Sequence, residues 1–278
     1  MTLNKTISLI FSAKSLLVSG FALIAALTSS IGQAGDTVSF YLPLHSKHDS
    51  KTVIELKQAL NQAGINNIEI VTADYWQQYQ QSFRNGKVGV YYGPPHFTAW
   101  AIEKHNFTAL VKIKKPLQYV LASKKSHTEI FEVRDLTDKQ VCTQSALNLD
   151  YLHLIDSFSE SLKAAKPIEV LSISDELNNT GSACSAFSIS NHWLLENPNH
   201  HYIRLSQSPV YSNYAISVHP SLSSVFSKEL KKALQTKRVK DALAPLIAKS
   251  SNDPGLIEAN NKDYPSHYTK SLKRFWRE

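Results

Sequence analysis

The chain has 278 residues, and 30 lysines and arginines against 23 aspartates and glutamates give it a formal net charge of +7. This length allows one or two domains with a substantial core. The excess of positive charge is mild and includes no arginine-rich run, so binding to nucleic acid is not indicated. With only nine glycines, nucleotide-binding loops are not expected, and the sequence predicts no cofactor.

Residues 1–34 are expected to form a removable signal peptide. Lys5 and Lys14 supply a basic start, and the segment contains no acidic residue. The apolar run that follows is too short to cross a bilayer comfortably as a helix, and Gly32 and Ala34 favour cleavage after Ala34. An uncleaved membrane anchor is the alternative. We therefore expect a protein secreted to the periplasm.

From residue 37 the chain alternates between short apolar strands and amphipathic helices. The pattern indicates strand, helix, strand, helix, strand, helix, which predicts a parallel sheet covered by helices. The strands are expected at 37–44, 68–71 and 87–92, and the third helix at 95–104.

A break in this pattern predicts a second α/β unit. Two extended segments lie between 107 and 122, and a new series of strands and helices begins at Gln140. Extended chain returns at 202–219, and two helices follow it. An aromatic C-terminal helix closes the chain; we expect it to dock by its aromatic face, and a membrane-surface helix is the alternative. The series has expected strands at 141–143, 168–173 and 183–189 and a helix at 150–164.

This order is typical of a two-lobed α/β protein in which the chain crosses between the lobes twice. We expect lobe 1 to comprise 35–118 and 210–278, and lobe 2 to comprise 119–209. The crossings, near 117–122 and 209–215, would act as hinges. A cleft between the lobes is the preferred place for a ligand.

The most informative motif is a strand that stops at a tight turn and restarts as a helix. Tyr92 ends the expected strand, Gly93 permits a sharp turn, and Pro94 and Pro95 prevent the strand from continuing. In open α/β sheets, ligands bind where a strand runs into a helix N-terminus. The turn therefore predicts one wall of a small-molecule site.

Cys142 and Cys184 are the only cysteines. An even pair in an oxidising compartment favours a disulfide, while two buried thiols or a catalytic thiol are the alternatives. No nucleophile or zinc-protease motif is present, so the protein is not expected to be an enzyme. His45 and His48 lack a third ligand and predict no metal site, and Asp175-Glu176 fits a solvated helix start.

Four stretches of the chain follow a family pattern. They are Asp74-Tyr75 followed by a helix and Asn85-Gly86-Lys87-Val88-Gly89-Val90, the turn Tyr92-Gly93-Pro94, residues 135–141 and residues 209–220. Together they resemble the phosphonate/phosphite-type solute-binding proteins of ABC importers. This resemblance implies the type II periplasmic binding protein fold, an ABC permease as membrane partner and a monomer. A sensory module that reports to a membrane-bound signalling protein is the alternative, and an enzyme on the same scaffold is the third hypothesis.

The resemblance implies ligand contacts in both lobes, but the second lobe departs from the family pattern. The stretch 143–150 lacks the glycine turn that holds an anion, and Asp150 would face an anion with like charge. The ligand therefore stays open between a phosphate-like or phosphonate-like oxyanion and an amine or neutral solute stacked on aromatic side chains. Trp76 is expected to pack in the core. The expected ligand-binding residues are Tyr75, Tyr92, Gly93, His96, Thr143, Ser145, Asn148, Ser188 and Asn191.

Overall fold

The computed structural model describes residues 37–43, 50–73, 75–144, 146–158, 165–170, 173–178, 182–198, 201–248 and 255–276. Residues 38–278 form one compact unit. The predicted signal peptide, Asp74, the His45–His48 pair and the predicted ligand residue Ser145 lie outside the described residues.

Among the described residues, no helix combines the length and the apolar character needed to cross a membrane.

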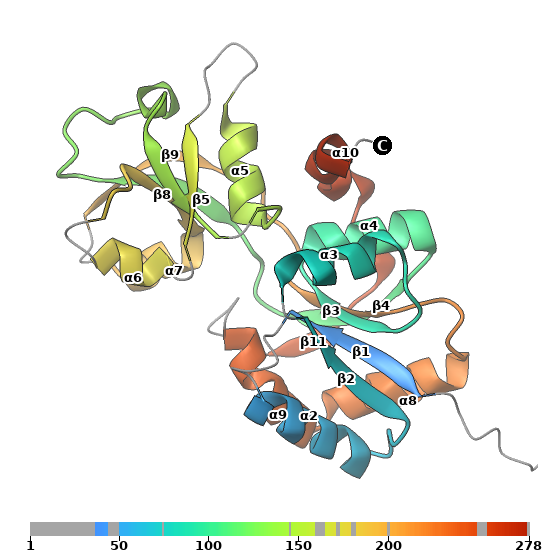
Figure 1. The fold of residues 1–278 in the computed structure, drawn as a ribbon. Coiled ribbons are helices and arrows are strands. Elements are labelled where there is room, and N and C mark those ends of the chain that lie inside the picture. Colours follow the sequence, from blue (N-terminus) through green and yellow to red (C-terminus); the bar gives the residue numbers. More distant parts are fainter. Residues whose placement is uncertain are drawn as a thin grey trace, which may run out of the picture. The chain divides into compact units, whose positions relative to one another are not determined.

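The first lobe is built on a mixed sheet with the strand order β11-β4-β10-β3-β1-β2 (Figure 1). β1 pairs in parallel with β2 and β3, and Phe40 lies opposite both Ile70 and Val90. β10 runs antiparallel to β3 and β4, and the chain enters it on its return from the second sheet. The strands are β1 (Val38–Leu42), β2 (Ile68–Thr72), β3 (Val90–Gly93), β4 (Thr108–Ile113), β10 (Ala215–Val218) and β11 (Leu256–Glu258).

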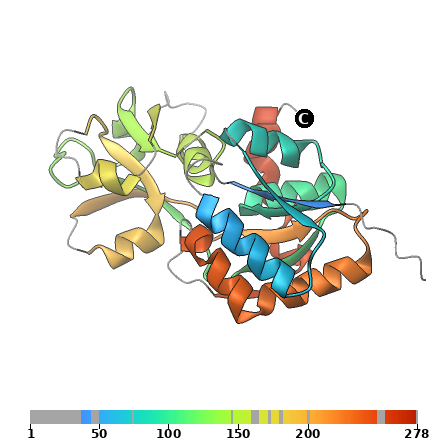
Figure 2. The same cartoon turned by 60° about the horizontal axis from the view of Figure 1, so that its bottom comes forward.

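Helices cover both faces of this sheet (Figures 1 and 2). Both faces need covering because successive side chains of β3 are apolar and point to opposite faces. Val90 and Tyr92 belong to the aliphatic core on one face, and Tyr91 belongs to the aromatic core on the other. The aliphatic face is covered by α2 (Ser50–Gln62), α8 (Ser224–Gln235) and α9 (Lys237–Ala248), and the aromatic face by α3 (Trp76–Arg84), α4 (Pro95–His105) and α10 (Lys270–Trp276).

The second lobe is built on a smaller mixed sheet with the order β7-β6-β8-β5-β9. β6 is parallel to β7 and β8, whereas β5 is antiparallel to β8 and β9. The strands are β5 (Tyr119–Lys124), β6 (Gln140–Thr143), β7 (Lys166–Glu169), β8 (Ala186–Ser190) and β9 (Tyr202–Gln207), and the helices are η2 (Val133–Leu136), α5 (Leu149–Ser157), α6 (Ile173–Asn178) and α7 (Asn191–Glu196).

One expected strand of this lobe is wrong in its second half. The strand predicted at 168–173 is β7 at Lys166–Glu169, and Ile173 instead begins α6. Ile173 is buried in the same cluster as Phe187 and Leu194, so a helix buries it as well as a strand would. The helix predicted at 150–164 is α5, and residues 159–164 lie outside the described part.

Two segments, 114–118 and 208–214, connect the sheets and pair with each other. Leu117 N donates to Tyr211 O at 3.0 Å and Tyr211 N donates to Leu117 O at 2.8 Å. Ser208 N also donates to Tyr119 O at 2.9 Å. The first crossing ends earlier than predicted, because β5 of the second sheet already begins at Tyr119.

The chain closes with η3 (Asn261–Asp263), η4 (Ser266–Thr269) and α10. Trp276 stacks on Phe97 with ring centroids 5.7 Å apart and meets Trp100 edge-on at 4.5 Å. Leu272 is buried beside them. The C-terminal helix is therefore docked by its apolar face, as the sequence predicts.

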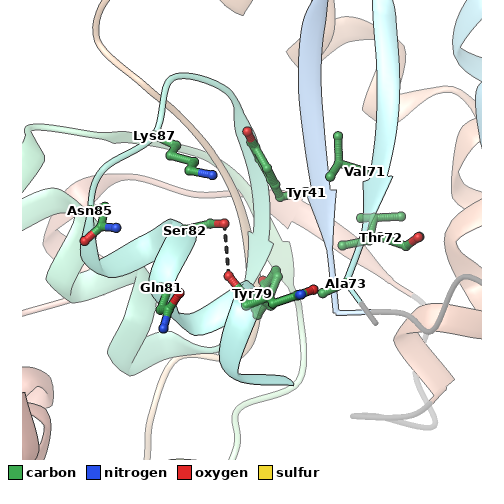
Figure 3. Close-up of a pocket in the computed structure, with 11 residues that line it drawn as sticks. Tyr41, Val71, Thr72, Ala73, Tyr79, Gln81, Ser82, Asn85 and Lys87 are labelled. Atoms are coloured by element: carbon green, nitrogen blue, oxygen red, sulfur yellow. Dashed lines mark hydrogen bonds between the residues drawn. The ribbon is translucent and has the colours of Figure 1, made fainter. Parts of the chain in front are cut away.

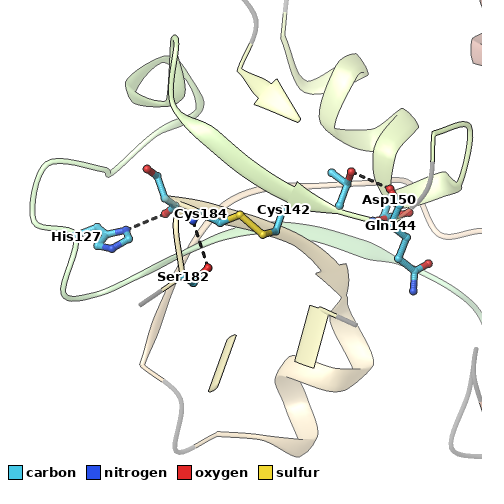
Figure 4. Close-up of a disulfide and its surroundings, with 8 residues drawn as sticks. His127, Cys142, Gln144, Asp150, Ser182 and Cys184 are labelled. Atoms are coloured by element: carbon cyan, nitrogen blue, oxygen red, sulfur yellow. Dashed lines mark hydrogen bonds between the residues drawn. A yellow bond between two sulfur atoms is a disulfide. The ribbon is translucent and has the colours of Figure 1, made fainter. Parts of the chain in front are cut away.

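A disulfide joins Cys142 of β6 to Cys184, which precedes β8 (Figure 4). The two Cα atoms are 5.6 Å apart, and both residues belong to one buried cluster. The predicted pairing is thus present in the structure, and it links two neighbouring strands of the second lobe.

Candidate ligand-binding site

The turn between β3 and α4 is the strand-to-helix turn that the sequence predicts. Pro94 is extended, and Pro95 and His96 are the first residues of α4. A Cβ atom on Gly93 would collide with the ring of Phe83, so glycine is needed here because α3 packs closely against the end of β3. This close packing carries His96 into a buried position at the start of α4.

His96 links the first lobe to the second. Its side chain is 0% exposed, and Nε2 lies 2.9 Å from the main-chain oxygen of Leu147. Burial lowers the pKa of His96 to about 3, although the hydrogen bond to Leu147 opposes this shift. The ring is therefore neutral at neutral pH, and its Nδ1 is buried with no hydrogen-bond partner among the residues that the structure describes.

Two side chains of α3 hold Ala146, the residue that precedes Leu147 in the second lobe. Trp76 Nε1 and Gln80 Nε2 both donate to Ala146 O, at 3.1 and 2.9 Å. Trp76 also stacks on Tyr79 with centroids 5.3 Å apart, so its predicted packing role is combined with a polar contact. The turn at 146–147 is thus held by three donors of the first lobe.

Asp150 lies in the first turn of α5, just after this turn, and its side chain is 1% exposed. Its Oδ2 accepts a hydrogen bond from Gln144 N at 2.5 Å, while Oδ1 is buried and has no hydrogen-bond partner among the described residues. Burial raises the pKa of Asp150 to about 7; the amides of Gln144, Tyr151 and Asp150 oppose this rise, and Glu169 adds to it.

Four tyrosines lie where the two lobes meet, and the charge of Asp150 acts on two of them. The hydroxyl of Tyr79 donates to Tyr92 O, and the Tyr92 ring stacks on Tyr214 at 5.4 Å between centroids. Burial raises the pKa of Tyr79, Tyr119 and Tyr214, and the charge of Asp150 adds to the rise for the last two. We call His96, Asp150, Tyr79, Tyr92, Tyr119 and Tyr214 the junction cluster.

Several sequence-predicted residues lie at or next to this cluster. Tyr92 and His96 belong to it, and Ser188 Oγ donates to the main-chain oxygen of Asp150 at 2.8 Å. Thr143 is buried at the end of β6 and donates to Gln144 O at 3.0 Å. Asn148 is half-buried at the start of α5.

Two other predicted residues lie apart from the cluster. Asn191 donates to Gln118 Oε1 at 2.9 Å, beside the first crossing, and its own Oδ1 is buried with no partner from the described residues. Tyr75 precedes α3 and is 66% exposed. Ligand contact stays a prediction for all of these residues.

Sequence reasoning did not select Tyr79, Gln80, Tyr119 or Tyr214 for this site. Tyr79 carries one local signal, because it follows Trp76 by three residues and shares its helix face. Tyr119 and Tyr214 flank the two crossings, and their meeting with Asp150 depends on the packing of segments far apart in sequence.

A separate pocket of about 330 Å³ lies within the first lobe (Figure 3). It is bounded by the carboxyl ends of β1 and β2 and by α3, and Tyr79 also lines it. Its lining is mostly uncharged, with Lys87 as the charged member. Other lining residues are Tyr41, Thr72, Gln78, Gln81 and Ser82.

The described residues bring together no group of three or more His, Cys, Asp or Glu side chains that could hold a metal ion. Asp175 and Glu176 lie in the first turn of α6, where negative charge is favourable, and Asp175 is exposed.

No protein-family model and no curated protein matches the chain. Solved structures do match it. A protein of Xanthomonas citri bound to ATP is 12% identical, with a TM-score of 0.63 over 88% of this chain and 99% of that one. PhnD1 from Prochlorococcus marinus in complex with methylphosphonate is 15% identical, with a TM-score of 0.61 over 86% and 97%.

A third match is the binding protein component of an ABC phosphonate transporter from Pseudomonas aeruginosa, which is 12% identical with a TM-score of 0.58 over 87% of both chains. The chain has the type II periplasmic binding protein fold. The two mixed sheets and the double crossing agree with it, so the predicted fold class is confirmed. Because the sequence identities are only 12–15%, the similarity to these structures establishes the fold alone.

Proposed function

We propose that the protein is a periplasmic solute-binding receptor that traps a small polar ligand between its lobes for an ABC importer. The observation that carries this proposal is the unmet hydrogen-bonding capacity at the junction. His96 Nδ1 and Asp150 Oδ1, one on each lobe, are buried and have no hydrogen-bond partner in the part of the chain that the structure describes. Buried polar atoms are normally satisfied, so these two are suited to a bound molecule.

The connection between the lobes supports a change of conformation on binding. The chain crosses at 114–118 and 208–214, and the pairing of Leu117 with Tyr211 makes these segments a common hinge. On the first-lobe side, Trp76, Gln80 and His96 grip a short turn through single hydrogen bonds. Such contacts can be exchanged for ligand contacts, so a ligand that binds one arrangement better shifts the equilibrium toward it.

The transport role rests on two further observations. One similar structure is described as part of an ABC phosphonate transporter and another holds methylphosphonate. The sequence of residues 1–34 also predicts export, which would bring the protein to the face of the membrane where importers collect their solutes.

Titration calorimetry tests the receptor role on protein purified from the periplasm of cells that express the full chain. The panel comprises phosphate, phosphonates, sulfonates, amines, amino acids and sugars. We expect one ligand bound per chain, unchanged after release, and stabilisation by about 2.7 kcal/mol at 100 times its dissociation constant. Failure of every panel member to bind, or chemical conversion of the ligand, would contradict the proposal.

Two matched variants test the place of binding. Tyr119→Phe removes a hydroxyl of the junction cluster, and Tyr202→Phe removes one from the neighbouring strand β9. We expect the first to weaken binding about threefold to tenfold and the second to leave it unchanged. Equal affinity in both variants would mean that the ligand binds elsewhere, for example in the first-lobe pocket.

Cross-linking in cells distinguishes the two possible membrane partners. Cross-linking to a permease would support transport, and cross-linking to a signalling protein would support sensing.

A further inference from the structure

Above the pKa of Asp150, the two polar atoms left over in the junction cluster are both hydrogen-bond acceptors. His96 Nε2 faces the main-chain oxygen of Leu147, and because a carbonyl oxygen only accepts, Nε2 carries the proton. The neutral ring therefore presents a lone pair at Nδ1, which is buried and accepts no hydrogen bond from the described residues. A solute bound here would supply that donor.

Asp150 leads to the same conclusion from the other lobe. Oδ2 already accepts the amide of Gln144, and the main-chain oxygen of Asp150 accepts the hydroxyl of Ser188. Within the described ranges, Oδ1 is left with lone pairs and no partner, at a side chain that is 1% exposed. The unmet need is again a donor, and it is greatest when the carboxyl group is ionised.

Asp150 also occupies the place where an anionic solute would otherwise be attracted. The N-terminus of α5 and the amide of Gln144 form a region of positive potential, and the protein's own carboxylate already lies against it. An oxyanion there would compete for the same amide and be repelled by the same charge. The other members of the junction cluster, neutral His96 and the four tyrosines, supply no positive charge that offsets this repulsion.

A cation fits these groups better. An ammonium group has three N–H donors and no acceptor, and the electron-rich faces of tyrosine rings attract positive charge. We propose that the solute carries a protonated amine, whose N–H groups donate to Asp150 Oδ1 and His96 Nδ1 among the tyrosines of the junction cluster. This inference rests on the receptor function proposed above and names the chemical class of its ligand.

Matched probe pairs test the class directly by calorimetry at pH 8. Putrescine is compared with 1,4-butanediol, and 2-aminoethylphosphonate with ethylphosphonate, so each pair differs in its amines. We expect the amine member to bind about tenfold more tightly or better in at least one pair. If ethylphosphonate, phosphate or butanediol binds as tightly as its amine counterpart, the amine inference is wrong and the receptor function stands. If no solute of the wider panel binds, the receptor function itself fails.

Two variants test the residues. Asp150→Asn keeps the shape of the side chain and removes its charge, and we expect amine affinity to fall about tenfold or more. Asp241→Asn makes the same change at an exposed residue of α9 that pairs with Lys237, and should have no effect. Unchanged amine affinity in Asp150→Asn would overturn the inference.

His96→Gln keeps the test independent of whether Asp150→Asn folds. The glutamine amide nitrogen can still donate to Leu147 O in place of Nε2, but the Nδ1 acceptor is lost. We expect weaker amine binding in a chain that keeps its circular dichroism spectrum and its disulfide. Wild-type amine affinity in this variant would contradict the role of His96 in holding the amine.

Discussion

The two lobes follow related sheet patterns but are stabilised differently. The first has a large aliphatic core on one face of its sheet and an aromatic core on the other. The second has two smaller clusters of its own, one of which contains the Cys142–Cys184 disulfide, and Leu152 of its helix α5 joins the aromatic core of the first. On the function proposed above, the well-packed first lobe provides the fixed wall of the candidate site, and the cross-linked second lobe provides the polar turn and Asp150.

Removal of the disulfide should have the largest effect, because it should destabilise the second lobe and leave the first lobe folded. In the chain-entropy model a bridge across a separation of 42 residues stabilises by about 4 kcal/mol. We expect the Cys142→Ala, Cys184→Ala double variant to lose about that much free energy of unfolding. Hydrogen exchange should rise mainly in β6, β7 and β8, with β1 and β3 protected. An equal rise in both sheets would mean that the lobes unfold as one unit.

Asp150 should make stability depend on pH. Its pKa is raised to about 7 in the folded protein, so between about pH 4 and pH 7 the folded chain holds a proton that the unfolded chain has lost. Its contribution to stability therefore falls as pH rises through this window, by about 1.4 kcal/mol for each unit of pKa shift. The charged and titratable groups that act on it include Glu169, Tyr119 and Tyr214.

The measurement is a difference between urea unfolding curves. His96 and His153 have pKa values lowered to about 3 and 4, so their contributions rise with pH and oppose that of Asp150 in the wild-type profile. Both histidine contributions cancel when the free energy of unfolding of ligand-free Asp150→Asn is subtracted from that of the wild type at each pH. We expect the stability of the variant relative to the wild type to rise by a few kcal/mol between pH 4 and pH 7. A constant difference would show that Asp150 is not buried as described.

Gly93→Ala tests the fixed wall of the first lobe. The new methyl group would collide with the ring of Phe83 where α3 packs on the end of β3. Overpacking of this kind costs about 1–3 kcal/mol, measurable as a lower urea midpoint. Adding Phe83→Leu to Gly93→Ala should recover part of the loss in a double-mutant cycle. Strict additivity of the two changes would argue against the close contact.

Trp76→Phe should have the smallest effect. It removes the donor to Ala146 O but retains an aromatic ring against Tyr79. We expect a loss of about 0.5–1.5 kcal/mol and faster hydrogen exchange at the 146–147 turn. Trp193→Phe, in α7 of the second lobe, is the control. Faster exchange in both variants would show that the turn is not held by Trp76 in particular.

Local patterns in the sequence account for most of the architecture. The spacing of Leu56 and Leu60 predicts a helix whose buried side packs on the sheet, and Gly93-Pro94 predicts the turn into α4. The two crossings follow from the order of elements. Ile173 shows the limit, since a single apolar residue is buried equally well by the end of a strand or the start of a helix.

The sequence by itself determined the fold class and the strand-to-helix turn, because both depend on residues that are close together in the chain. It favoured the disulfide, since Cys142 has one possible partner, but it left open whether the bond forms. Only the tertiary structure decided which atoms meet at the junction. His96 and Leu147 are 51 residues apart, and Tyr79 meets Tyr92 and Tyr214 through the packing of three elements. Hydrophobic periodicity fixes which face of an element is buried, but it carries no information about which polar atom across the interface is left without a partner.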